Sequence, residues 1–97
     1  MIRSLGNQSP KIHPTAFVSE AAYVIGNVEI GEGSSIWPGT IIRGDTHKIN
    51  IGKFTNIQDN SVLHGDAEVF IGDHVTIGHR VMCHAKNIGP RCLIGNG

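Results

Sequence analysis

Branched aliphatic residues recur every six positions along most of the chain. The first series contains Ile12, Val18, Val24, Ile30, Ile36 and Ile42. The spacing resumes after a three-residue insertion near residues 47–50, then a two-residue insertion and one deletion, giving Ile51, Ile57, Leu63, Ile71, Ile77, Cys83, Ile88 and Ile94. A period of six fits neither a helical stripe nor a long alternating strand, whereas it fits a short strand and a corner, repeated.

A second inward-facing set is expected four positions after each aliphatic residue. These positions hold small or β-branched residues, namely Ala16, Ala22, Val28, Ser34, Thr40, Thr46, Thr55, Ser61 and Ala67. One six-residue unit buries little by itself, so stability must come from stacking coil on coil around a column of Ile and Val. The alternative, a β-sandwich, would place strands at intervals of about 8–12 residues.

In this repeat the chain resembles hexapeptide-repeat proteins, which fold as a left-handed parallel β-helix with three hexads in each triangular coil. The resemblance implies an all-β fold of four to five coils in one domain, with residues 1–11 as a lead-in and residues 12–97 as repeats. The usual C-terminal coils and helix of that family are missing, so the chain is either a short member or a truncated fragment. We expect its open last coil to pair with a second molecule, joining two assemblies end to end.

Counting three hexads to a coil sorts the polar residues by face. Arg43, His64 and His84 each directly follow an inward aliphatic position, in hexads six, nine and twelve, so they share one face in successive coils. Neighbouring strands lie about 4.8 Å apart, which lets two stacked histidines bind one metal ion. The first half of a metal site is therefore predicted on this face.

The remaining candidate residues lie on a different face. Gln58 and Asp59 belong to hexad eight and His79 to hexad eleven. His79 therefore joins His64 and His84 only if a second copy of the chain supplies it, and the simplest closed arrangement is a ring of three copies. Three imidazoles with one open position are typical of a catalytic zinc centre. The other three histidines, His13, His47 and His74, are expected to be ordinary surface residues.

Five motifs make the chain similar to the γ-class carbonic anhydrase family. They are IWPGTIIRGD at 36–45, INIGKFTNIQD at 49–59, SVLH at 61–64, IGDHVTIGH at 71–79 and CHAKNIGPRCLIG at 83–95. The resemblance implies that His64, His79 and His84 are the metal ligands, with His79 donated by the neighbouring subunit of a homotrimer. The implied activity is the reversible hydration of CO2 to bicarbonate by metal-bound hydroxide at the subunit interface, which is a lyase reaction.

The same resemblance assigns the surrounding polar residues. Gln58 matches the residue that hydrogen-bonds the hydroxide, and Asn56 lies near it in the same motif. Arg43, Asp45 and Asp59 match the charged network that holds the subunits together and lines the site. The implied cofactor is a divalent metal, with Zn favoured and Fe, Co or Ni also compatible with three imidazoles.

The chain departs from the family pattern around the proton path. The connection after His64 is only GDAEVF, so Asp66 or Glu68 would have to replace the glutamate of the longer loop, and Thr46 stands at a second acidic position. A slow or inactive enzyme is therefore one expectation. Two other functions stay open: a non-catalytic metal-binding or scaffold protein, and a hexapeptide-repeat acyltransferase that uses a histidine base.

Composition excludes few functions but is consistent with this picture. Eight basic residues balance eight acidic ones, which gives no electrostatic basis for binding nucleic acid or an anionic membrane. There is no apolar stretch of membrane-spanning length and no signal-peptide pattern, so a cytoplasmic location is expected. Cys83 and Cys92 fall on inward repeat positions, and both are expected to pack in the core.

Overall fold

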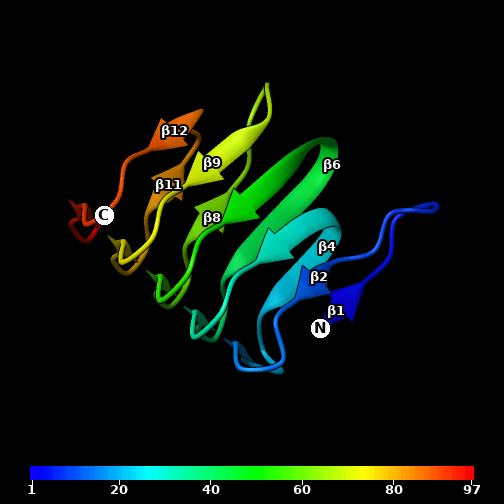
Figure 1. Ribbon diagram of the computed structural model, residues 1–97, viewed down its shortest axis with the longest axis horizontal. Coiled ribbons are helices and arrows are strands. Elements are labelled where there is room, and N and C mark those ends of the chain that lie inside the picture. The colour runs from blue at the N-terminus through cyan, green and yellow to red at the C-terminus, as the bar shows by residue number, and fades with distance from the viewer.

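The six-residue spacing winds the chain into a left-handed parallel β-helix whose coils stack from the N-terminus to the C-terminus (Figure 1). The computed structural model describes all 97 residues. The strands are β1 (Ile2–Arg3), β2 (Lys11–Ile12), β3 (Phe17–Val18), β4 (Tyr23–Ile30), β5 (Ser35–Ile36), β6 (Ile41–Ile51), β7 (Asn56–Ile57), β8 (Val62–Leu63), β9 (Val69–Ile71), β10 (Thr76–Ile77), β11 (Met82–Cys83), β12 (Asn87–Ile88) and β13 (Leu93–Ile94). The structure contains no helix that could span a membrane.

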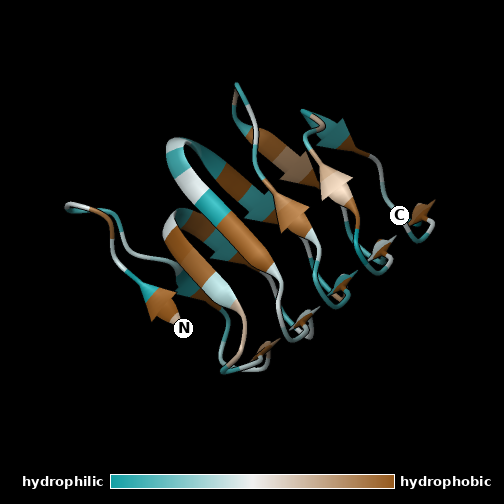
Figure 2. Ribbon diagram, turned by 180° about the vertical axis from the view of Figure 1, so that it is seen from behind, coloured by the Kyte–Doolittle hydropathy of each residue, from teal (hydrophilic) through white to brown (hydrophobic).

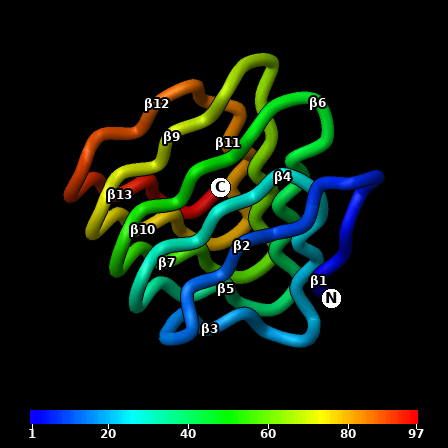
Figure 3. The backbone as a smooth tube through the Cα atoms, turned by 45° about the vertical axis from the view of Figure 1, so that its right-hand side comes forward, coloured from blue at the N-terminus to red at the C-terminus, as the bar shows by residue number.

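The coils have three walls, which can be followed in Figure 3. The first wall contains β2, the second halves of β4 and β6, then β9 and β12. The second wall contains β3, β5, β7, β10 and β13. The third wall contains β1, the first halves of β4 and β6, then β8 and β11. All strand pairs within the walls are parallel, as the predicted fold requires.

The predicted register between coils is confirmed on the walls that carry the site. On the second wall, Ile36 pairs with Ile57 and Ile57 with Ile77. All three side chains are fully buried. They belong to one continuous core of 17 residues that runs along the axis of the helix. Hydrophobic stretches, brown in Figure 2, recur on neighbouring strands from coil to coil. Burial of this column is the main stabilising contribution.

The two insertions lie earlier than the sequence analysis places them. The register between β4 and β6 passes from Gly26–Gly44 to Val28–Ile49, so the three extra residues fall between Gly44 and Ile49. The prediction that Thr46 points inward is therefore wrong: Thr46 is exposed, and Ile49 is buried in its place.

The second insertion has the same effect. Ala67 is only partly buried, and Val69, which pairs with Ile49, occupies the core position predicted for it. In both cases an aliphatic side chain two or three positions further along is the better core residue, because it buries more apolar area. Cys83 is buried as expected, whereas the expectation that Cys92 packs in the core is wrong: Cys92 is exposed in the last coil.

Two strands continue around a corner instead of ending there. β4 and β6 each run from the third wall into the first wall, and Gly26 and Gly44 are paired where they bend. A Cβ atom on Gly44 would lie 2.3 Å from the Asn27 carbonyl oxygen, so only glycine lets the two backbones approach so closely. The lead-in also contributes a strand, since Ile2 of β1 pairs with Val24 of β4.

Replacing one central core residue should test the stacked column. We expect Ile57→Ala, at a fully buried position, to lower the free energy of unfolding by about 2–5 kcal/mol. Phe70→Ala, on an outward position that is 47% exposed, should change it by less than about 0.5 kcal/mol. Urea unfolding followed by circular dichroism measures both. Equal losses for the two variants would contradict the predicted core.

Candidate metal centre

Two of the predicted ligands lie side by side on the third wall. His64 directly follows β8 and His84 directly follows β11, and the inward residues before them, Leu63 and Cys83, are paired in register. Because alternate residues of a strand point to opposite sides, both imidazoles project outward from adjacent coils. Their ring centroids are 5.5 Å apart with planes tilted by 57°. The stacking of these two histidines, predicted from the repeat, is confirmed.

A charged pair from the preceding coil surrounds His64. Its Nε2 donates a hydrogen bond of 2.8 Å to Oδ1 of Asp45. Arg43 contacts both partners: its Nε lies 3.3 Å from Oδ2 of Asp45, and its Nη2 lies 3.3 Å from Nε2 of His64. Thr46, at the position where an acidic residue was expected, donates its backbone N–H to Asp45 over 2.8 Å. Arg43 and Asp45 therefore adjoin one predicted ligand within a single chain.

Electrostatics at Asp45 follow from these contacts. The hydrogen bond from His64 is the main reason why the pKa of Asp45 falls from its ordinary 3.8 to about 2, and the Thr46 N–H adds to the effect. The carboxylate is thus ionised at any pH where the protein would work. An ionised acceptor beside an imidazole fixes which ring nitrogen carries hydrogen, as commonly occurs beside metal-binding histidines.

His79 lies at the corner between the second and third walls. It precedes Arg80, whose φ of 55° marks the left-handed turn of that corner. Asp59 occupies the equivalent corner of the previous coil, before Asn60, which has a φ of 61°. Nδ1 of His79 is 3.3 Å from Oδ1 of Asp59. The sequence prediction that His79 and Asp59 share a face apart from His64 is confirmed.

The short loop after His64 brings one of its two acidic residues back to the histidines. Oδ1 of Asp66 lies 3.6 Å from Nε2 of His84. Glu68 points elsewhere, because its carboxylate accepts a hydrogen bond from Asn50 on the first wall. Sequence reasoning named both as candidate replacements for the missing glutamate but did not pair Asp66 with His84. The two-residue insertion in the repeat was the only available signal that the chain bulges there.

The neutral polar candidates lie on the same wall as His79. Asn56 belongs to β7, and its Oδ1 is buried without a hydrogen-bond partner. Gln58 directly follows β7, and its backbone is fixed on both sides, accepting from Thr40 Oγ1 and donating to Ile77. A buried amide oxygen without a partner is costly in a finished structure. This oxygen can therefore accept a hydrogen bond from a group outside the chain.

Within one chain no three histidine, cysteine or carboxylate side chains converge in a way that could hold a metal ion. His64 and His84 form a pair, and His79 lies around the corner on another wall. The donor chemistry nevertheless fits a zinc-type ion, since all three are imidazoles. A three-histidine site therefore needs a second copy of the chain.

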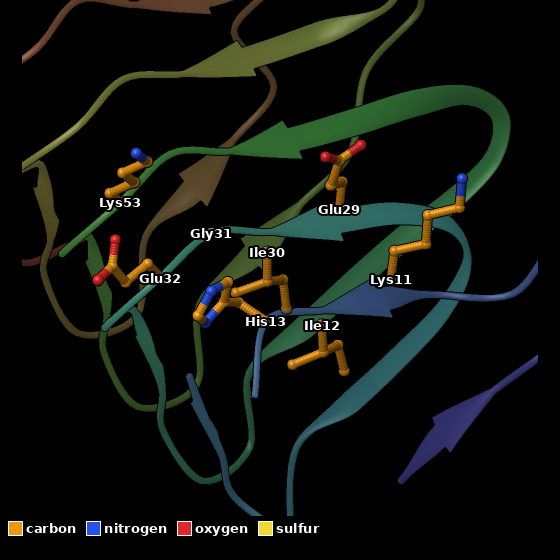
Figure 4. A pocket seen from close by; sticks show the side chains of 8 residues that line it. All are labelled: Lys11, Ile12, His13, Glu29, Ile30, Gly31, Glu32 and Lys53. Atoms are coloured by element: carbon orange, nitrogen blue, oxygen red, sulfur yellow. The ribbon is translucent and has the colours of Figure 1, made fainter. Parts of the chain in front are cut away.

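The one pocket in the chain, drawn in Figure 4, is lined by none of these three histidines. It is an open hollow against β2 and β4, lined by Lys11, Ile12, His13, Glu29, Ile30, Gly31, Glu32 and Lys53. Its two lysines and two glutamates balance in charge, and Glu29 is already paired with Lys48 at 2.7 Å. We therefore place the candidate site at the histidines.

Comparisons with known proteins match both the repeat and the motifs. A family model described as bacterial transferase hexapeptide (six repeats) matches residues 9–44. The mitochondrial γ carbonic anhydrase 1 of Arabidopsis thaliana is 42% identical over 99 residues, and a carbonic anhydrase of Geobacillus kaustophilus is 41% identical over 99 residues. The chain belongs to the γ-class carbonic anhydrase family of hexapeptide-repeat proteins.

These matches cover nearly all of this chain but only part of each relative. The matches span 94% and 100% of this chain, but only 36% of the Arabidopsis protein and 54% of the Geobacillus protein. A solved structure, a hexapeptide transferase family protein from Anaplasma phagocytophilum, superposes with a TM-score of 0.79 at 32% identity. That match covers 99% of this chain and 75% of the other. The Anaplasma protein thus shares the fold that carries His64 and His84 in this chain.

The lowered pKa of Asp45 gives a prediction for the part of the site around His64. Its carboxyl 13C resonance should titrate with a midpoint of about 2, and the midpoint should rise toward 3.8 in His64→Ala, because the largest cause of the shift is removed. Since the pKa is lower in the folded state, the ionised group stabilises the fold above about pH 4, and this contribution is lost as the pH falls toward 2.

Glu29 provides an internal control in the same NMR titration. Its pKa is lowered chiefly by the hydrogen bond from Lys48, which the His64→Ala substitution does not touch. The Glu29 midpoint should therefore stay constant between the two proteins. An Asp45 midpoint that does not move in His64→Ala would contradict the assigned contact.

Proposed function

We propose that the chain provides a carbonic anhydrase-like active site that hydrates CO2 reversibly, with each site shared between two copies. The observation that carries the proposal is the stacked pair His64 and His84, held beside the ionised Asp45. Identities of 41–42% to proteins named carbonic anhydrases support the choice of reaction. Because this chain spans only part of those relatives, the activity is a proposal for the assembled protein.

His64 and His84 of one chain and His79 of a neighbouring chain would hold the metal. Zn suits three neutral imidazoles, and Fe, Co or Ni can also bind such a set. When bound, the ion acts as a Lewis acid that makes water nucleophilic near neutral pH, for which carbonic anhydrase itself is the standard example. The other tasks of the site fall to the side chains of the protein.

Each nearby side chain has a task suited to its chemistry. Gln58 is neutral and offers both a donor and an acceptor, so it can orient the attacking water without competing for the ion. Asn56 lies on the same wall with a free amide oxygen that a second copy could satisfy. Arg43 neutralises Asp45 and adds positive charge where a bicarbonate anion leaves. Asp66 is the acidic group at His84 from which a proton can pass to solvent.

The third wall also offers a surface for a second copy. Outward residues of its strands form an apolar ladder in register, consisting of Tyr23, Ile41, Val62 and Met82. Ile41 is 41% and Met82 is 68% exposed. The ladder lies two residues before Arg43, His64 and His84 on the same strands, so a neighbour packed there would also reach the histidines. Because the ladder differs from the corner that carries His79, the contact is heterologous and closes most simply as a trimer.

Acyl transfer is the second candidate, supported by the hexapeptide transferase family structure that superposes on this chain. It would require a histidine base and a thioester site, but it would not require His79 to meet His64 and His84. A non-catalytic metal-binding or scaffold protein would keep the apolar ladder and lack activity. Metal analysis separates the transferase from the other two, and CO2 hydration separates the enzyme from the scaffold.

The test measures zinc content and CO2 hydration by stopped flow on the purified protein. We expect about one zinc per chain, catalysis well above the uncatalysed rate, and loss of both in His64→Ala. Gln58→Ala should keep its zinc and lose about 10- to 100-fold in rate, because it removes a group that orients water rather than a ligand. His13→Ala serves as the matched control, because the His13 ring hydrogen-bonds only with Thr15. Wild-type protein that binds zinc yet fails to hydrate CO2 would refute the proposed activity.

A further inference from the structure

We propose that Asp59 is a positioning residue for His79, holding Nδ1 so that Nε2 is the nitrogen presented to a metal shared with a neighbouring copy. The proposal rests on the function proposed above and deepens it. The family resemblance assigns Asp59 only to a charged network between subunits. The structure also places its carboxylate 3.3 Å from the imidazole of its own chain.

The contact favours one tautomer of the imidazole. Oδ1 of Asp59 is 3.3 Å from Nδ1 of His79. A carboxylate presents only acceptor atoms, so a lone pair on Nδ1 would be repelled at this distance, whereas an N–H is attracted. The contact therefore favours the tautomer with hydrogen on Nδ1, in which Nε2 keeps the lone pair that a metal requires.

Coil stacking sets the separation of the two residues. Asp59 and His79 lie two positions after Ile57 and Ile77, which are paired in register on the second wall. The corner backbones are also joined, because the N–H of Arg80 donates to the carbonyl of Asp59 over 3.0 Å. The backbone of His79 is also held, because its main-chain N–H donates a hydrogen bond of 2.9 Å to Oδ1 of Asn96. The rigid corner thus brings the carboxylate to the ring, although both side chains are partly exposed.

The arrangement differs from that of the other two histidines. His64 and His84 direct Nε2 at their carboxylates, Asp45 and Asp66. His79 alone directs Nδ1 at its partner, which leaves free the ring nitrogen that lies farther from the backbone. That longer reach suits a ligand that must extend to a site on another chain. All three imidazoles carry a carboxylate partner from their own chain, so each can be oriented before copies assemble.

The test measures Zn2+ affinity by chelator competition and the tautomer of His79 by 15N NMR of the metal-free protein. In the wild type, Nδ1 should show the shift of a protonated ring nitrogen and Nε2 that of an unprotonated one. Asp59→Ala should show mixed tautomers and bind Zn2+ about 10- to 100-fold more weakly. Asp59→Asn, which keeps an acceptor oxygen, should restore most of the affinity.

Two controls separate positioning from a general structural role. Glu20 occupies the same corner position two coils earlier, with Pro38 rather than a histidine in the next coil, so Glu20→Ala should leave Zn2+ affinity unchanged. In a His79→Ala background, Asp59→Ala should cause no further loss of affinity. The mass of the assembly in solution should be the same for Asp59→Ala and the wild type.

The possible failures are distinguishable. Wild-type protein that binds no Zn2+ would overturn the proposed function and this inference together. Tight binding that is unchanged in Asp59→Ala, or an Nε2 that carries the hydrogen in the wild type, would overturn the inference alone. Affinity lost together with the assembly would show that Asp59 acts as a subunit contact and would also overturn the inference.

Discussion

Parallel hydrogen bonding between successive coils is the constraint on which the rest of this structure depends. It holds residues of neighbouring coils at one strand spacing, and burial of the Ile and Val column fixes which residues face each other, because a slip would expose the core. Val24, Ile42, Leu63 and Cys83 follow one another in this way along the third wall. The polar residues directly after the last three are thereby placed in a row, which brings Arg43, His64 and His84 together.

The same constraint explains what the sequence could predict. A strict period of six predicts stacked short strands, and the family resemblance implies three hexads in each coil. With both, counting alone assigns each candidate residue to its wall. It fails where the count is interrupted. The position of an insertion is set by which side chain fills the core best, so Ile49 and Val69 were missed in favour of Thr46 and Ala67. The pairing of Asp66 with His84 depends on the path of the shorter insertion, which no periodic pattern encodes.

The candidate site combines a regular scaffold with side chains that have no partner within the chain. The coil scaffold orients the imidazoles, and carboxylates of the same chain pair with each of them. Yet His79 stands on a separate wall, a buried amide oxygen of Asn56 has no partner, and an apolar ladder beside His64 and His84 is open to solvent. These features have one common explanation in the proposed account: the chain carries two complementary halves of a site, and assembly joins the halves of different copies. Fold and function then depend on the same repeat.

Mixed assemblies of inactive variants test this central claim most directly. His79→Ala keeps the His64–His84 half, and His64→Ala keeps the His79 half, so co-assembly of the two should restore zinc at about one interface in four for random mixing in a ring of three. A mixture of His64→Ala with His84→Ala should restore none, because no chain then has both stacked histidines. Zinc recovered in the first mixture only is the predicted result. Zinc absent from both mixtures, while the wild type binds it, would contradict a site shared between copies.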